Sequence, residues 1–252
     1  METNNKVIIA SINKLRYIAN TSFVIISKKG TIVVIDPFKV DPDIKPDIIA
    51  VTHTHYDHYN KDYIDKANCF KIIAETGGFE HLDIKITGIA SSHHGDSINE
   101  ETPDNVIYIF EVDGLRIVHF GDLGQSTLNE GQLGQIGKVD IAMMQFINPN
   151  SDFTLQNQKG LRLLQQVNPS IVIPTHAFGL KKALIGKKYF ILPVHRTGKT
   201  FWMLKKLWGP VLTTEYIKVD GEEIDKGLPK AVWMNRTLRW IDICLLRSNI
   251  ID

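Results

Sequence analysis

Residues 52–59 read T-H-T-H-Y-D-H-Y, and this segment decides how the rest of the chain is interpreted. It directly follows D-I-I-A-V at 47–51, an apolar run that is typical of a buried strand. Alternation along an extended chain places His53 and His55 on one side, and Asp57 and His58 follow where the chain turns into a helix. Imidazole and carboxylate groups together suit zinc, iron or manganese. The segment therefore predicts a metal site at the end of this strand.

The alternative is a group of ordinary surface histidines. The chain has nine histidines, and three of them fall between residues 53 and 58. Further candidates follow other apolar runs, each just beyond the end of a predicted strand: His93 and His94, then Asp122, then His176. Loops that a rigid sheet holds at its strand ends commonly carry reactive groups. A single such histidine would more often be structural, but the repetition favours a metal site.

Composition excludes several classes of protein. The 252 residues include 29 Lys+Arg and 28 Asp+Glu, with 43% hydrophobic and 23% charged residues, which excludes a disordered chain, a coiled coil and a collagen-like fibre. A net charge of +1 argues against nucleic acid or an anionic membrane as the main electrostatic partner. Cys69 and Cys244 lack metal-binding spacing and fit a reducing compartment. With neither a signal peptide nor a transmembrane run, we expect a cytoplasmic protein without a membrane partner.

Short runs rich in Val and Ile predict most of the strands. The Asp113-Gly114 pair between two of these runs is a strong hairpin signal. The predicted strands cover residues 21–27, 31–35, 47–52, 84–90, 106–112, 115–120, 139–146 and 170–174. Helices are predicted over 60–66, over part of 126–135, and from an N-cap at Thr154 to residue 166. No repeat or linker interrupts the chain, so 1–252 is expected to form a single domain.

The pattern after residue 177 is less clear. Residues 181–188, K-K-A-L-I-G-K-K, are basic. Within 228–252, residues 229–248 have helix-like apolar spacing and contain Trp233 and Trp240. We expect a helix packed on the core there. The alternative is an exposed helix face that forms a homo-oligomer.

In their order along the chain, these motifs resemble the metallo-β-lactamase superfamily of binuclear metallohydrolases. The match runs from about residue 18 to 178 and includes H-x-H-x-D-H, a later His, G-D and a final His. The runs N-T-S-F-V-I and G-T-I-V-V-I-D-P resemble the family's first two strands, which end here at Asp36. The run from 105 to 124 is most similar to the ascorbate-6-phosphate-lactonase-like branch. The resemblance implies an α/β fold: a four-layer αββα sandwich of two mixed sheets flanked by helices.

The resemblance also implies a ligand set. It assigns one metal to His53, His55 and His94, the other to Asp57, His58 and His176, with Asp122 bridging them. His94 rather than His93 is preferred because S-H-H-G-D then aligns without a gap with the pattern S-F-H-D-D. Asp36, His93 and His119 are expected behind the ligands, where hydrogen bonds orient metal-bound imidazoles.

The implied activity is hydrolysis. Two divalent ions, expected to be zinc with manganese or iron as alternatives, would supply a bridging hydroxide that attacks a lactone, thioester or phosphodiester. Asp57 would orient this nucleophile or take its proton. His195 is a candidate proton donor, although a lone His before Arg196 is more often a packing or surface residue. Lys181, Lys182, Lys187 and Lys188 would favour a phosphorylated small molecule, unless they belong to a solvated loop.

Two other functions are considered. A nuclease of the same fold usually carries an added nucleic-acid-binding region, and this chain has neither extra length nor a basic excess. A catalytically inactive metal-binding protein is the second alternative. It is less favoured because every ligand position is filled.

Overall fold

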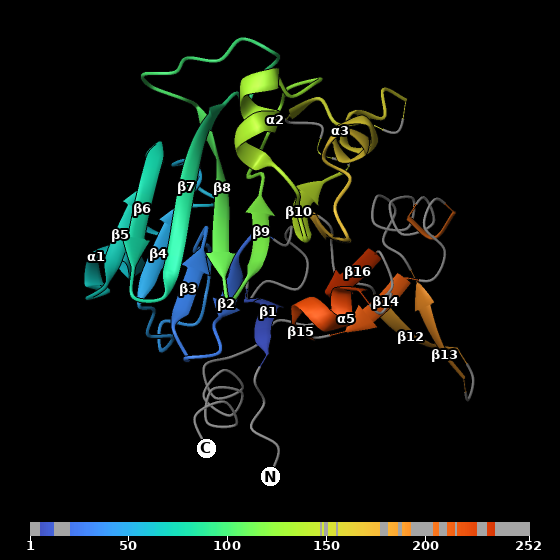
Figure 1. Ribbon diagram of the computed structural model, residues 1–252. Coiled ribbons are helices and arrows are strands. Elements are labelled where there is room, and N and C mark those ends of the chain that lie inside the picture. The colour runs from blue at the N-terminus through green and yellow to red at the C-terminus, as the bar shows by residue number, and fades with distance from the viewer. Residues whose placement is uncertain are drawn as a thin grey trace.

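Two large sheets pack face to face in the computed structural model of the chain (Figure 1). The structure describes residues 6–12, 21–146, 148, 151–154, 156–176, 181–185, 188–192, 204–206, 211–214, 216–225 and 231–234. The first sheet has six strands in the order β15-β1-β2-β3-β4-β5. The second has eight in the order β14-β16-β11-β10-β9-β8-β7-β6, and β12 and β13 form a separate pair.

Both large sheets contain parallel and antiparallel pairs. The strands of the first sheet are β1 (Val7–Ser11), β2 (Phe23–Ile26), β3 (Ile32–Ile35), β4 (Ile48–Val51), β5 (Phe70–Ile73) and β15 (Tyr216–Val219). Those of the second are β6 (Gly77–His81), β7 (Ile84–Ser91), β8 (Asn105–Val112), β9 (Leu115–His119), β10 (Ile141–Gln145), β11 (Ile171–Thr175), β14 (Val211–Thr214) and β16 (Ala231–Met234). The separate pair is β12 (Lys181–Ile185) and β13 (Lys188–Leu192), and the helices are α1 (Lys61–Lys66), α2 (Glu130–Ile136), α3 (Lys159–Val167) and α5 (Gly221–Asp225).

The apolar runs are continuous because both faces of each sheet are covered. In β3, Val33 and Ile35 point into the core between the sheets, whereas Ile32 and Val34 point to the outer face. Ile64 of α1 packs in that outer cluster, while α2 and α3 cover the outer face of the second sheet. The predicted four-layer αββα arrangement is confirmed.

Each predicted strand range overlaps a strand of the structure, with ends that agree within two residues. The predicted hairpin is also present: Val112 pairs with Leu115, and Asp113 and Gly114 have φ values of 51° and 84°. Positive φ at both positions is the geometry of a type I′ turn, which explains the Asp-Gly sequence. The structure adds strands that the sequence did not reveal, among them β1, β5 and β6.

Helix α1 begins as predicted, since the Asn60 side chain accepts a hydrogen bond of 3.1 Å from Tyr63 N. In α2, Asn129 and Gln132 form a capping box. The predicted start of the third helix is wrong. Thr154 exchanges side-chain to backbone hydrogen bonds of 3.1 Å with Asn157, and this local turn delays α3 until Lys159.

The predicted helix over 229–248 is also wrong where the structure describes it. Residues 231–234 form strand β16, parallel to β11 and β14. Periodicity cannot distinguish a short apolar strand from a helix segment, which explains the error. Trp240 and residues 235–252 lie outside the described residues. Among the described residues, no helix has the length and apolar character needed to cross a membrane.

Candidate metal centre

The candidate ligands follow the ends of strands from both sheets. His53 and His58 follow β4 in the first sheet, whereas Asp122 and His176 follow β9 and β11 in the second. At the end of the sandwich where these strands finish, which we call the site edge, a backbone hydrogen bond of 3.0 Å from Val106 N to Thr52 O joins the two sheets. The edge therefore brings together loops that are far apart in the sequence.

Asp122 lies at the centre of this group, and it is 3% exposed. Its carboxylate lies 2.6 Å from His176 Nε2 and 3.1 Å from His93 Nε2. His58 Nε2 is 3.5 Å away and His53 Nε2 is 3.9 Å away. Four imidazole rings thus turn the same nitrogen toward one buried carboxylate.

The donor atoms form three overlapping groups, in each of which all atoms lie within 4.8 Å of one another. The groups are His53-His55-His93, His53-His58-Asp122 and Asp57-His58-His176. The structure therefore brings together the expected ligands except for one of the two adjacent histidines.

His94 was the expected ligand, but these groups contain His93 in its place. His94 is exposed, and its Nδ1 lies 3.3 Å from the Nδ1 of His93. His93 is 3% exposed, and its Nε2 faces Asp122. The His93 N–H donates a hydrogen bond of 2.9 Å to Asp104, which fixes the backbone at this position. The two rings lie side by side, with centroids 4.1 Å apart, but only His93 belongs to a group of converging donor atoms.

The hydrogen bonds of Thr52 define the protonation of His53. The Thr52 hydroxyl lies 2.9 Å from Asp36 Oδ2 and 3.0 Å from His53 Nδ1. An ionised carboxylate only accepts, so the hydroxyl donates to Asp36 and accepts from His53 Nδ1–H. His53 Nε2 is then an unprotonated, buried nitrogen without a hydrogen-bond partner among the described residues. A buried lone pair of this kind is what a metal ligand must offer, so the residues fit a metal ion.

The buried Asp36 carboxylate accepts hydrogen bonds from Thr52 and from two histidines next to the cluster. These hydrogen bonds are 2.7 Å long from Thr52 N, 2.8 Å from His58 Nδ1 and 2.9 Å from His119 Nε2. Asp36 and His119 thus lie behind the candidate ligand His58, and the orienting role that the resemblance implies for them stays a prediction. Because His58 donates through Nδ1, its Nε2 is directed toward Asp122.

The electrostatics of the cluster favour a bound cation. Burial alone raises the pKa of Asp122, but His176 and His58 outweigh it and hold that pKa well below its usual range. Burial lowers the pKa of His58, but Asp36 and Asp122 raise it to about 10. Burial together with the charge of His58 lowers the pKa of His53 to about 2. The carboxylates thus attract positive charge, while His53 stays neutral.

Two glycines explain the G-D-L-G sequence at 121–124. Gly121 has φ 56°, and a Cβ there would overlap the Asn105 side chain. A Cβ on Gly124 would overlap the carbonyl of His93, and the Gly124 N–H donates a hydrogen bond of 2.7 Å to Ser92 O. Both glycines therefore permit the loop that carries Asp122 to approach its neighbours closely.

Two asparagines of the site were missed by sequence reasoning. Asn105 Oδ1 accepts a hydrogen bond of 2.9 Å from Asp122 N, and Asn105 Nδ2 donates one of 3.0 Å to Phe120 O. Asn148 Nδ2 lies 3.4 Å from Asp122 Oδ1 and 2.7 Å from Gln145 Oε1. Asn105 begins the run 105–124 that carries part of the family resemblance, but the run alone assigns it no role, and Asn148 belongs to no motif quoted above.

Some predicted residues are not placed at the site. His195 and Lys187 lie outside the described residues. Lys181 and Lys182 belong to β12, and Lys188 belongs to β13, rather than to a solvated loop. The roles of His195 and of these lysines stay predictions.

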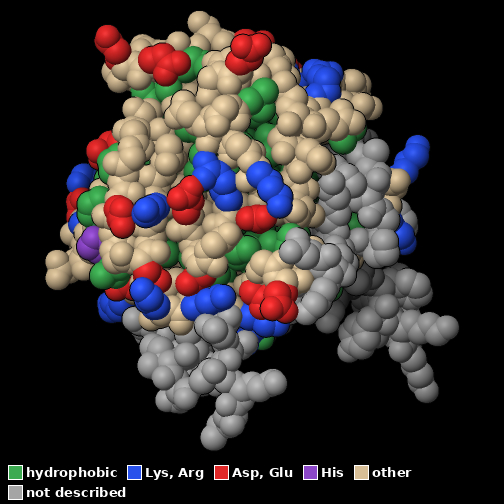
Figure 2. Space-filling view, in the orientation of Figure 1, with side chains coloured by type: hydrophobic (Ala, Val, Ile, Leu, Met, Phe, Trp, Pro, Cys, Tyr) green, Lys and Arg blue, Asp and Glu red, His purple; other side chains and the backbone are tan. Residues whose placement is uncertain are grey.

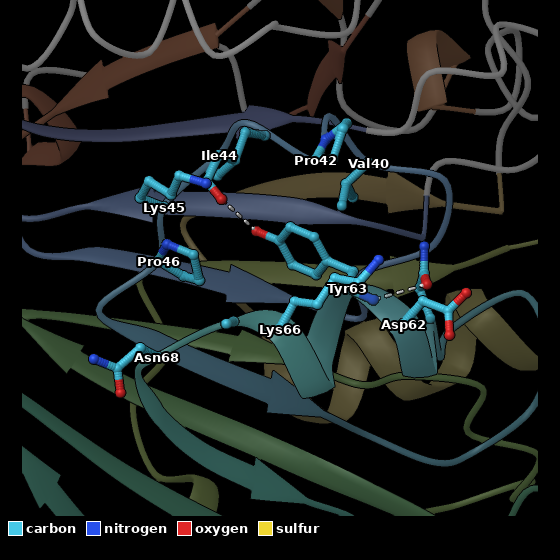
Figure 3. Close-up of a pocket in the computed structure, with 11 residues that line it drawn as sticks. Val40, Pro42, Ile44, Lys45, Pro46, Asp62, Tyr63, Lys66 and Asn68 are labelled. Atoms are coloured by element: carbon cyan, nitrogen blue, oxygen red, sulfur yellow. Dashed lines mark hydrogen bonds between the residues drawn. The ribbon is translucent and has the colours of Figure 1, made fainter.

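A surface groove of about 510 Å³ lies apart from the histidines, between α1 and residues 40–46 (Figure 3). Tyr63 spans it and donates a hydrogen bond of 3.0 Å to Ile44 O (Figure 3). No candidate ligand lines this groove. The convergence of buried donors, rather than the size of a cavity, therefore identifies the functional site.

A family model described as "Beta-lactamase superfamily domain" matches residues 14–176. The chain belongs to the metallo-β-lactamase superfamily. A UPF0173 metal-dependent hydrolase from Methanobrevibacter smithii is 26% identical, and the match covers 65% of this chain and 81% of that protein. A relative of the same description from Methanosarcina mazei is also 26% identical, and the match covers 65% of this chain and 82% of that protein. The more specific resemblance to the ascorbate-6-phosphate-lactonase-like branch stays a prediction.

Solved structures support the fold. A protein from Thermotoga maritima, described as a Zn-dependent hydrolase of the metallo-β-lactamase superfamily, superposes with a TM-score of 0.59 at 20% identity, covering 90% of this chain and 97% of that one. CmlA, a diiron β-hydroxylase from Streptomyces venezuelae, superposes with a TM-score of 0.51 at 10% identity, covering 93% and 54%. At these identities the likeness concerns the fold alone. Proteins of different described chemistry share it, so function must be argued from the site.

Proposed function

We propose that the chain is a binuclear metal-dependent hydrolase of an ester-type bond in a small molecule. One metal would be held by His53, His55 and His93, and the other by Asp57, His58 and His176, with Asp122 between them. The observation that supports this proposal is the buried convergence of imidazole nitrogens on Asp122, among which His53 Nε2 has no other described partner.

Nitrogen and oxygen donors suit zinc best, and manganese or iron would use the same set. When bound, two such ions would lower the pKa of a water molecule toward about 7 and polarise the substrate oxygen. A lactone, a thioester and a phosphodiester all react with a nucleophile made in this way.

The residues of the chain would orient the reactants. Thr52 and Asp36 fix the rings of His53 and His58 through their Nδ1 atoms, so that their Nε2 atoms stay available. The Thr21 hydroxyl donates a hydrogen bond of 2.9 Å to the carbonyl of Asp57 and holds this part of the loop. The Asp57 carboxylate would take the proton of the attacking water, because its oxygen belongs to the same group as His58 and His176.

The charge of the chain supports a small-molecule substrate over a nucleic acid. The net charge is +1, and acidic and basic side chains are interspersed on the one face shown in Figure 2. A nucleic-acid groove would instead require basic residues gathered along one path.

The first test is elemental analysis of protein purified without a chelator or a histidine tag. We expect about two divalent ions per chain, and hydrolysis of at least one member of a panel of lactones, thioesters and phosphodiesters. Asp122→Ala should lose both the metal and the activity, whereas Asp65→Ala, at an exposed position of α1, should keep both. Full activity of Asp122→Ala, or a protein that takes up no metal on reconstitution, would refute the proposal.

A further inference from the structure

Tyr56 stands out as an exposed aromatic residue between two candidate ligands, His55 and Asp57. Its side chain is 80% exposed, more than the other exposed large hydrophobic residues of the described chain, Leu82 at 62% and Leu212 at 37%. A single exposed apolar residue needs no explanation by itself, but a ring next to candidate ligands offers a flat surface on which a substrate group can pack.

The exposure of the ligands shows from which side a substrate must arrive. His53, His58, His93 and Asp122 are buried, so the sheets close those sides of the cluster. His55 is exposed, and Asp57 and His176 are partly exposed. Tyr56 lies between His55 and Asp57 in the sequence, so the loop that carries it forms part of the exposed side of the cluster.

The loop that carries Tyr56 is fixed. The N–H groups of His58 and Tyr59 both donate hydrogen bonds of 3.0 Å to the carbonyl of His55, which makes a tight turn with Tyr56 near its apex. The carbonyl of Asp57 accepts the Thr21 hydroxyl at 2.9 Å. The ring is thus presented on a constrained backbone, which reduces the entropy lost when it binds a ligand.

A second aromatic residue supports the ring. Tyr56 and Phe38 meet edge to face, with centroids 6.0 Å apart and planes at 86°. Phe38 is 7% exposed, and its N–H donates a hydrogen bond of 3.0 Å to Ser22 Oγ. Lys39 Nζ lies 5.4 Å from the Phe38 centroid. The exposed side of the cluster is thus bordered by an anchored aromatic pair with a cation beside it.

We propose that Tyr56 determines substrate specificity by packing against an aromatic or flat apolar group next to the bond that is cleaved. Lys39 would favour a substrate that also carries negative charge. This inference rests on the proposed hydrolase function. It adds the substrate class: an anionic ester-type compound with an aryl or similar substituent.

The test compares phenylphosphonate with methylphosphonate, which carry the same tetrahedral anionic group and differ in the substituent. Their dissociation constants for the zinc-loaded protein are measured by calorimetry, after the zinc content of each variant has been determined. Tyr56→Ala should reduce the preference for the phenyl compound by about 2- to 10-fold, the range for an aromatic pair. Tyr56→Phe should keep the preference, and so should Leu82→Ala, which removes an exposed apolar side chain from the β6–β7 turn.

An unchanged preference in Tyr56→Ala would overturn the inference while leaving the hydrolase proposal intact. Loss of zinc from Tyr56→Ala would also overturn it, because the residue would then support the metal loop instead. If wild-type protein that carries zinc does not prefer the phenyl compound, the specificity role is refuted, whereas the hydrolase proposal is decided separately by the metal content and the substrate panel described above.

Discussion

Replacing Thr52 with Val should weaken metal binding without removing any ligand. Valine keeps the shape of threonine but lacks the hydroxyl that accepts from His53 Nδ1 at 3.0 Å and donates to Asp36 at 2.9 Å. Thr52 and Asp36 are both fully buried, so no bulk water replaces the lost partner. A buried donor left without an acceptor costs about 1–3 kcal/mol. Loss of a hydrogen bond behind a metal ligand typically lowers metal affinity by about 10- to 100-fold.

Both quantities can be measured on the same protein. Chelator competition gives the zinc affinity, and denaturant unfolding of the metal-free protein gives the free energy of unfolding. Thr52→Ser is the matched control because it keeps the hydroxyl and removes only a methyl group. We expect the serine variant to bind zinc within a few-fold of wild type. Equal zinc affinity in the valine and serine variants would refute the role assigned to the hydroxyl.

Three further predictions concern neighbouring features of the fold. His93→Ala should lose bound metal, whereas His94→Ala should retain it; elemental analysis that gives the reverse order would reject the ligand assignment. Gly124→Ala should lower both the thermal midpoint and the metal content, because the added Cβ meets the His93 carbonyl. Gly134→Ala is the control: open space surrounds this position of α2, so the thermal midpoint should stay the same or rise. Burial raises the pKa of Asp83, but hydrogen bonds from hydroxyl groups outweigh it and lower the pKa below 3.8. Its stabilisation is therefore complete above the usual Asp pKa and is lost as the pH falls through the lower folded-state pKa. Asp83→Asn should be less stable than wild type at pH 7, and the difference should shrink as the pH falls below the usual Asp pKa; a constant difference in unfolding free energy would contradict this.

The sequence predicts the centre of the fold well because the signals there are local. The run 47–51 is apolar on both faces, and Asp113-Gly114 requires positive φ, so the central strands and their hairpin can be predicted from neighbouring residues alone. The ligands between 53 and 58 are equally local. Their contacts with Asp122 and His176 could be expected only from the rule that ligands gather at strand ends, together with the family resemblance.

The errors occur where local signals conflict or tertiary contacts decide. Thr154 is a good N-cap residue, but its pairing with Asn157 delays the helix. Residues 231–234 have an apolar pattern that fits a helix, but they add to the sheet beside β11. The choice between His93 and His94 depends on which ring the chain turns toward Asp122. That direction follows from long-range contacts, such as the hydrogen bond of His93 N to Asp104, which spacing does not encode.

The hydrogen bond from Val106 N to Thr52 O marks an edge at which both sheets contribute to one site. An ion held there by His58 of the first sheet and His176 of the second would join the two halves of the sandwich, so the free energy of metal binding would also oppose separation of the sheets. Metal-free protein should therefore open at this edge first. Amide hydrogen exchange would show this as faster exchange at the ends of β4 and β9 than at the β8–β9 hairpin on the opposite edge.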